Sequence, residues 1–208
     1  MLSFQTILPD TLELLKQLMQ MSELKDMRLV GGTSLALQYG HRRSVDLDFF
    51  GRATEDVDEL TDALKHCVDK VVLGGHSKSI KSYFLNGVKV DFVNYRYAWI
   101  DDCILDYGLR MASPKDIAAM KVNAVIGGGT KKDFVDIYFL LQHFTFRDLM
   151  QLYLQKYPDG SVYRALLSMA YFGDGDPQPM PCMFENGGWE PIKQRIRFEV
   201  ESYNQSLL

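Results

Sequence analysis

The pattern of apolar residues changes near Ala112, and this change limits the fold more than any other feature of the chain. Before it, short stretches typical of strands alternate with amphipathic stretches, whereas after it the spacing is almost wholly helical. Ser113-Pro114, an N-cap residue followed by proline at the first helical position, marks the start of the second part. We therefore expect an α/β core over residues 1–112 and a helical C-terminal region over 113–208.

The first part is predicted to form a small mixed sheet with helices packed on it. Strands are expected over 27–30 and 44–50, a hairpin over 79–85 and 88–95 with Asn86-Gly87 as its turn, and helices over 9–26, 33–39 and 54–68. Gly74 and Gly75 are expected to shape a turn. In the second part, helices are expected over 114–126, 131–143, 146–156, 162–170 and 191–204, and a loop rich in Gly and Pro over 173–188.

The composition argues against a disulfide-rich protein, a membrane protein and a globally basic nucleic-acid-binding protein. The chain has 208 residues, of which 47% are hydrophobic and 24% are charged, as in an ordinary globular protein. The net charge of −4 gives no global basic surface for nucleic acid, so any such site has to be local. Cys67, Cys103 and Cys182 are widely spaced, which is typical of reduced thiols. Without a membrane span or a leader, the expected location is the cytoplasm, with no membrane partner.

Two acidic residues on one expected strand are the first chemical signal. Asp46 and Asp48 are two positions apart, so both carboxylates point to the same face of a strand. Adjacent carboxylates repel each other unless cations neutralise them, and hard oxygen ligands suit Mg²⁺, with Mn²⁺ as an alternative. Asp91, on the later expected strand, can complete a cluster for two ions if the strands are neighbours. Two such ions clamp the attacking and leaving oxygens of a displacement at phosphorus.

A glycine turn precedes this strand. Gly31 and Gly32 lie where a strand is expected to pass into a helix, so the backbone can approach an anion closely. The N–H groups and the positive dipole end of that helix, with the hydroxyls of Thr33 and Ser34, would bind phosphate. A phosphate site beside a hard-cation site is the equipment of phosphoryl or nucleotidyl transfer. The alternative, that Asp46 and Asp48 only form a solvated strand edge, is less favoured once the glycines are included.

These motifs resemble a known family. Gly31-Gly32-Thr33, followed after thirteen residues by Asp46-Leu47-Asp48, resembles the signature of polymerase-β-type nucleotidyltransferases. The sequence around both motifs is similar to that of the AbiEii/AbiGii toxin family, and so is the later segment from Ser113 to Tyr138. The resemblance covers about residues 5–145. The resemblance implies a polymerase-β-like core that moves NMP from an NTP to an acceptor hydroxyl and releases pyrophosphate. It also implies a helical region that completes the cleft.

The resemblance further implies roles for individual residues. Asp46, Asp48 and Asp91 would ligate two Mg²⁺ ions, and Asp91 would also serve as a base toward the attacking hydroxyl. Gly31, Gly32, Thr33 and Ser34 would hold the NTP phosphates. Lys121 would neutralise triphosphate charge, and Asp133 and Asp136, three apart on one expected helix, would orient the nucleotide or the lysine. The implied biology is the toxin of a bacterial toxin–antitoxin or phage-defence pair, with tRNA or other RNA as acceptor and a cognate antitoxin.

One departure from the family keeps two alternatives open. The family often has an arginine between the lysine and the acidic pair, whereas this chain reads Gly127-Gly128-Gly129, and we align the missing residue with Gly128. Losing a guanidinium removes a bidentate phosphate contact. Besides the RNA-modifying enzyme, we therefore keep a protein that binds an NTP or a partner without turnover. A small-molecule nucleotidyltransferase of the antibiotic-modifying kind is the other alternative, because the same motifs would serve it.

Overall fold

The computed structural model describes residues 1–184 and 187–206, and the chain forms two compact units. The core unit consists of Met1–Tyr97 and Asp102–Ser113. The helical unit consists of Ala98–Asp101 and the chain from Pro114 onward. The chain therefore passes from the core unit to the helical unit, returns, and passes over once more.

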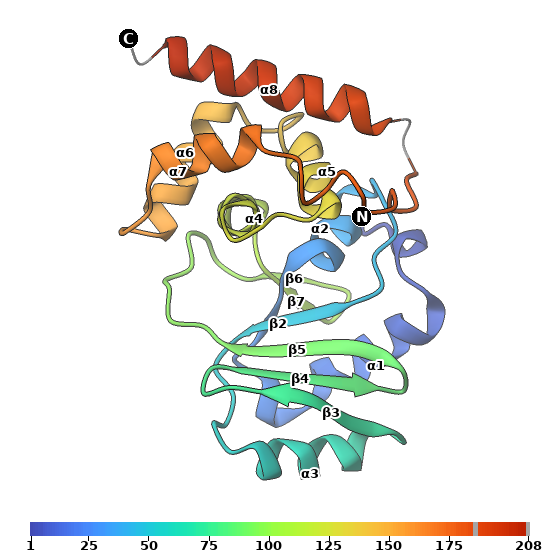
Figure 1. Ribbon diagram of the computed structural model, residues 1–208. Helices are drawn as coiled ribbons and strands as arrows, with labels where there is room; N and C mark the ends of the chain where they lie inside the picture. The colour runs from blue at the N-terminus through green and yellow to red at the C-terminus, as the bar shows by residue number, and fades with distance from the viewer. Residues whose placement is uncertain (185–186, 207–208) are drawn as a thin grey trace. The chain divides into compact units, whose positions relative to one another are not determined.

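The core unit is built on a mixed sheet, as the sequence predicts (Figure 1). In the described residues its strand order is β3-β4-β5-β2-β1-β7-β6. The strands are β1 (Arg28–Leu29), β2 (Leu47–Gly51), β3 (Val71–His76), β4 (Ile80–Leu85), β5 (Val88–Asn94), β6 (Ile104–Asp106) and β7 (Leu109–Met111). The pairs β2–β5 and β1–β7 are parallel, and the other neighbours are antiparallel.

Alternation along the central strands separates a buried face from a face that carries the acidic residues. Leu47, Phe49, Val90 and Phe92 are buried in the core, together with leucines from α1 (Pro9–Gln20) and α3 (Val57–Cys67). Asp48 and Asp91, at the intervening positions, belong to the opposite face and are half-buried. The third helix of this unit, α2 (Gly31–Tyr39), begins directly after β1, and short 3-10 turns occupy Phe4–Thr6 and Ser22–Leu24.

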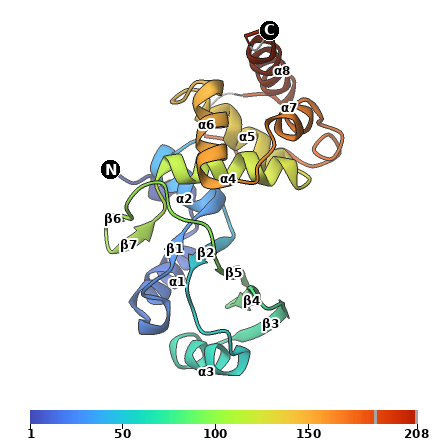
Figure 2. The same ribbon diagram turned by 90° about the vertical axis from the view of Figure 1, so that its left-hand side faces the viewer.

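The helical unit contains α4 (Pro114–Ile126), α5 (Lys131–Leu140), α6 (Phe146–Lys156), α7 (Val162–Ala170) and α8 (Trp189–Gln205). α4 packs against α5, α6 and α7, and α8 packs against the same three helices (Figures 1 and 2). The predicted helices are confirmed, with three of them matching at both ends. The expected loop over 173–188 is free of helix where it is described, and its positions 185–186 lie outside the described residues.

Four expectations about the core unit differ from the structure. Gly74 and Gly75 lie within β3, at a register irregularity between Leu73 and Gly75, so the predicted turn is wrong. Edge strands often carry such bulges, and the exposed side of β3 gives no alternation for a sequence pattern to reveal. β6 and β7 were not expected because three residues are too few to show a period. Asp46 precedes β2 instead of lying on it, and the first helix ends at Gln20 instead of near residue 26.

Two smaller expectations concern thiols and membranes. Cys67, Cys103 and Cys182 are free, as predicted. Burial raises the pKa of the Cys67 and Cys103 thiols, which keeps them protonated. Of the helices in the described part of the chain, none is both long and apolar enough to cross a membrane.

Candidate active site

Two carboxylates meet at the centre of the sheet because β2 and β5 run parallel as neighbours. Asp48 and Asp91 are Cα partners in this register. Residues paired in this way point to the same face, and the core occupies the other one. The structure therefore brings together two of the three carboxylates that the sequence predicts for a metal site. Asp46 lies in the segment before β2 and is half-buried.

The glycine turn lies against this pair. The N–H of Val30 donates to the backbone oxygen of Asp48 at 2.8 Å, which places the start of α2 beside β2. Gly31 has a φ of +66°, in the left-handed region, and a Cβ at this position would overlap the Asp48 carboxylate. Glycine is therefore favoured there for two reasons, since its φ lies in the left-handed region and any side chain would displace the Asp48 carboxylate. The predicted juxtaposition of the glycine turn and the acidic strand is present in the geometry.

The neighbouring residues of α2 are occupied by internal contacts. A Cβ on Gly32 would overlap the guanidinium of Arg42, a buried side chain that donates to the carbonyl of Arg43 at 3.1 Å. Thr33 and Ser34 are buried. The Thr33 hydroxyl donates to the carbonyl of Asp46. The Ser34 hydroxyl accepts from Gln38 Nε2 at 3.1 Å. A phosphate at this helix would accordingly meet backbone N–H groups and glycines, and the role of both hydroxyls toward phosphate stays a prediction.

Lys89 is a member of the site that the sequence reasoning missed. Its ammonium lies 2.8 Å from Asp91 Oδ2, and both side chains project from the same face of β5. The hydrogen bond to Asp91 raises the pKa of Lys89, burial opposes this rise, and the charges of Asp91, Asp48 and Asp46 add to it. All three predicted carboxylates therefore act on one cation. The spacing Lys-x-Asp on a strand was the signal that could have revealed it.

The oxygen ligands Asp48 and Asp91 fit a hard divalent cation, but they form only part of the predicted metal site. Asp91 Oδ1 is buried and, within the described residues, accepts no hydrogen bond. Such an oxygen is costly to bury unless it meets a donor or a cation. Asp48 and Asp91 would hold the ion, and carboxylate oxygens are what Mg²⁺ prefers. Across residues 1–184 and 187–206, however, the structure contains no group of three or more His, Cys, Asp or Glu arranged to enclose a metal. Asp46 as third ligand and the second ion therefore stay predictions.

The predicted residues of the helical unit also come together. Lys121 Nζ, on α4, lies 2.8 Å from Asp133 Oδ1 and 2.7 Å from Asp136 Oδ2, both on α5. Asp133 additionally accepts from the N–H and hydroxyl of Thr130, which caps the helix. Burial alone would raise the pKa of Asp133, but Lys121 and Thr130 outweigh it and lower this pKa. Lys121 thus has its charge compensated within the unit, and its role toward triphosphate stays a prediction.

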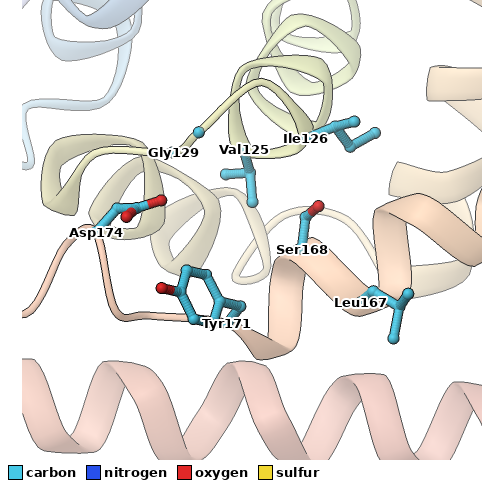
Figure 3. Close-up of a pocket in the computed structure, with 8 residues that line it drawn as sticks. Val125, Ile126, Gly129, Leu167, Ser168, Tyr171 and Asp174 are labelled. Atoms are coloured by element: carbon cyan, nitrogen blue, oxygen red, sulfur yellow. The ribbon is translucent and has the colours of Figure 1, made fainter.

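Two of the three consecutive glycines, Gly128 and Gly129, border a cavity of the helical unit. A hollow of about 270 Å³ is lined by the end of α4, by Gly128 and Gly129, and by Ser168, Tyr171 and Asp174 (Figure 3). Gly128, the position aligned with the family arginine, has a φ of +101° and has nothing within 4 Å of an added Cβ. There is therefore open space for a Cβ at this position, but its φ is one that side chains other than glycine rarely adopt. Lys131, the first residue of α5, is buried and donates to the carbonyl of Asp176 at 3.3 Å.

Comparison with known proteins places these features in a family. Residues 13–107 match the model of the family described as "Nucleotidyl transferase AbiEii toxin, Type IV TA system". An uncharacterised protein of Aquifex aeolicus, aq_aa25, is 30% identical over 200 residues, which cover 92% of this chain and 94% of that protein.

Solved structures show the same fold. MenT4, a nucleotidyltransferase toxin of Mycobacterium tuberculosis, matches with a TM-score of 0.61 and 19% identity over 90% of this chain and 79% of that one. A structure described as a putative nucleotidyltransferase from H. pylori matches with a TM-score of 0.55 and 19% identity over 96% and 97% of the two chains. The expected polymerase-β-like α/β fold is confirmed. The chain belongs to the AbiEii nucleotidyltransferase toxin family and is a nucleotidyltransferase.

Proposed function

We propose that the core unit carries out a divalent-metal-dependent transfer of NMP from an NTP to an acceptor hydroxyl, with release of pyrophosphate. The observation that carries this proposal is the registered pair Asp48 and Asp91, which lies against the glycine turn at Gly31. The same pair on a solvated strand edge would have no need of a glycine that makes room for a carboxylate.

The chain's own residues then act mainly by positioning and by charge. The first turn of α2 leaves backbone N–H groups without intrahelical partners, and these would bind the NTP phosphates. Asp48 and Asp91 would hold the divalent ion, Mg²⁺ or Mn²⁺, and the bound ion would polarise the reacting phosphate. Asp91 would also serve as the base that accepts the proton of the attacking hydroxyl.

The proposed biological role is that of a toxin in a bacterial toxin–antitoxin or phage-defence system, acting in the cytoplasm on RNA, with tRNA as the first candidate. The family description and the likeness to MenT4 support the toxin role. A cognate antitoxin is then expected as a functional partner. The family resemblance supports RNA as the acceptor class.

Incubation with α-phosphorus-labelled NTPs and Mg²⁺ tests the proposal, with total tRNA or an aminoglycoside as acceptor in parallel reactions. We expect label in the RNA, and none after EDTA is added. Label in the aminoglycoside would instead identify a small-molecule enzyme. NTP binding without transfer to either acceptor would identify a protein that binds without turnover, and the proposal would then be wrong.

A further inference from the structure

A hollow of the core unit lies at the carboxyl ends of the parallel strands β2 and β5. Its volume is about 450 Å³, and Arg52, Glu55, Asn94, Tyr95 and Arg96 are among the residues that line it. Ligands of open sheets commonly bind outside the carboxyl ends of parallel strands. Position alone therefore makes this hollow a candidate ligand site, distinct from the carboxylate pair further back on the same two strands.

The hollow has a backbone that is fixed before any ligand binds. The N–H of Tyr95 donates to the carbonyl of Gly51 at 2.8 Å, which ties the end of β5 to the end of β2. The side chain of Asn94 accepts from the N–H of Ala53 at 2.8 Å. Because both strand ends are held to each other, little conformational freedom is lost on binding.

Aromatic rings connect the carboxylate pair with the hollow. Phe50 shares its side of β2 with Asp48, and its ring centroid is 5.1 Å from that of Tyr95. Tyr95 is 5.5 Å from Tyr97, and the guanidinium of Arg96 lies 4.9 Å from the centre of the Tyr97 ring. Unpaired nucleobases stack on such rings and guanidinium planes.

The charges of the hollow favour a nucleotide over a polycation. Arg52 and Arg96 are exposed, and a guanidinium can donate two parallel hydrogen bonds to a phosphate. Glu55, also exposed, can accept from the exocyclic amino group of a base. An aminoglycoside would bring its ammonium groups to two arginines and would be repelled. This is the local basic site that a chain of net charge −4 needs in order to bind nucleic acid.

We propose that this hollow binds the acceptor as a single-stranded nucleic acid, with a base on Tyr95 and phosphates on Arg52 and Arg96. From Asp48 to Gly51 the strand advances three residues, roughly 10 Å at the usual rise per residue. The nucleotide bound here is therefore not the one that reacts but one further along the same strand. Its role as an acceptor rests on the proposed function, whereas the binding of a single strand does not.

The test measures binding of a fluorescein-labelled single-stranded RNA by fluorescence anisotropy, without NTP, at several salt concentrations. The double variant Arg52→Gln/Arg96→Gln is expected to raise Kd at least tenfold. It should also make the dependence of log K on log[salt] shallower by about 1.4, because each phosphate contact on a single strand contributes about 0.7. Tyr95→Leu should raise Kd about tenfold without changing this slope. Glu55→Gln should change the preference among bases and leave the slope unaltered.

The matched control is Arg164→Gln/Arg197→Gln, which removes two exposed arginines from the helical unit. We expect it to leave the Kd for RNA within twofold of the unmodified protein. Equal losses in both double variants, or unchanged affinity and slope in Arg52→Gln/Arg96→Gln, would overturn the proposed site.

This result is separable from the proposed function. Suppose that label transfer to RNA occurs and requires Asp48, while the affinity for RNA is unchanged in Arg52→Gln/Arg96→Gln. Only the proposed location of the acceptor site is then wrong. If the arginine variants lose RNA binding while the unmodified protein transfers no label, the hollow binds single strands and the proposed reaction is wrong.

Discussion

Asp48, Asp91 and Lys89 form a cluster of charges. Local spacing in the sequence accounts for part of this cluster, and long-range strand pairing accounts for the rest. The spacing of Asp46 and Asp48 is local, so the sequence alone could propose an acidic cluster. The pairing of Asp48 with Asp91 depends on β2 and β5 being parallel neighbours. A single sequence does not show which strands are neighbours, so it predicts only that the two carboxylates meet if these strands are adjacent. Lys89 was missed for a similar reason, because a lysine two positions before Asp91 is informative only once Asp91 is known to belong to the site.

Replacing Lys89 tests whether its ammonium competes with the proposed metal ion. Lys89→Met should strengthen Mn²⁺ binding severalfold, because it removes a positive charge that pairs with Asp91 at 2.8 Å. Electron paramagnetic resonance of free Mn²⁺ measures the affinity, and the exposed Lys70→Met serves as a charge-matched control. Unchanged or weaker binding in Lys89→Met would show that Asp91 does not hold the ion.

Asp133 offers a test by pH. Its pKa is lowered in the folded protein, so its contribution to stability is present above its ordinary value of 3.8 and is lost as pH falls through the folded value. Asp133→Asn should therefore lower the free energy of unfolding by about 1.5–3 kcal/mol at pH 7, the usual range for a hydrogen bond to a charged group. Urea titrations should show this difference shrinking below pH 3.8. A difference that is constant with pH would contradict the ion pair with Lys121.

Helices and strands could be predicted from the sequence where the periodic pattern of apolar residues extends over many residues. The helices of the second half consist of several repeated turns, and α6 and α7 begin after N-cap side chains, so local rules give both ends of three of the five predicted helices. Thr145, for example, accepts from the N–H of Asp148 at 3.1 Å and caps α6. β3, β6 and β7 are short or lie at the edges of the sheet, and their pairing is decided by tertiary contacts that the pattern does not contain.

The connection between α4 and α5 allows a prediction along three consecutive glycines. Gly127→Ala should be neutral or slightly stabilising, since an added Cβ would meet only ordinary contacts from 3.5 Å outward. Gly128→Ala should cost about 1 kcal/mol because its φ is +101°. Gly129→Ala should cost about 1–3 kcal/mol, since its Cβ would lie 2.9 Å from Val125 Cα. Chemical unfolding of the three variants gives the order, and a destabilised Gly127→Ala with a neutral Gly129→Ala would refute this geometry.

On the scale of the whole molecule, the chain crosses three times between units, and one buried ion pair holds the short segment Ala98–Asp101 to the helical unit. Asp116 and Lys156 have fully buried side chains and are 2.6 Å apart. Asp116 also accepts from the N–H of Ile100 at 2.9 Å, and Lys156 donates to the carbonyl of Ala98 at 3.0 Å. The segment is thereby part of the helical unit although the chain before and after it belongs to the core unit.

Breaking this pair should destabilise the protein strongly. Asp116→Ala is expected to lower the free energy of unfolding by about 3–5 kcal/mol, because it leaves the Lys156 ammonium buried without its partner. The double variant Asp116→Leu/Lys156→Met removes both charges and should recover part of that loss. Urea unfolding followed by circular dichroism measures both variants, and a double variant less stable than Asp116→Ala would contradict this explanation.

The most direct test of the account compares the unmodified protein with Asp48→Asn in the transfer of label from NTP to RNA in the presence of Mg²⁺. Asp48→Asn should lose transfer completely and should remain folded, with equal or slightly higher stability without metal, because one of two neighbouring carboxylates no longer carries charge. Full transfer by Asp48→Asn, or unfolding of this variant, would contradict the assignment of the active site.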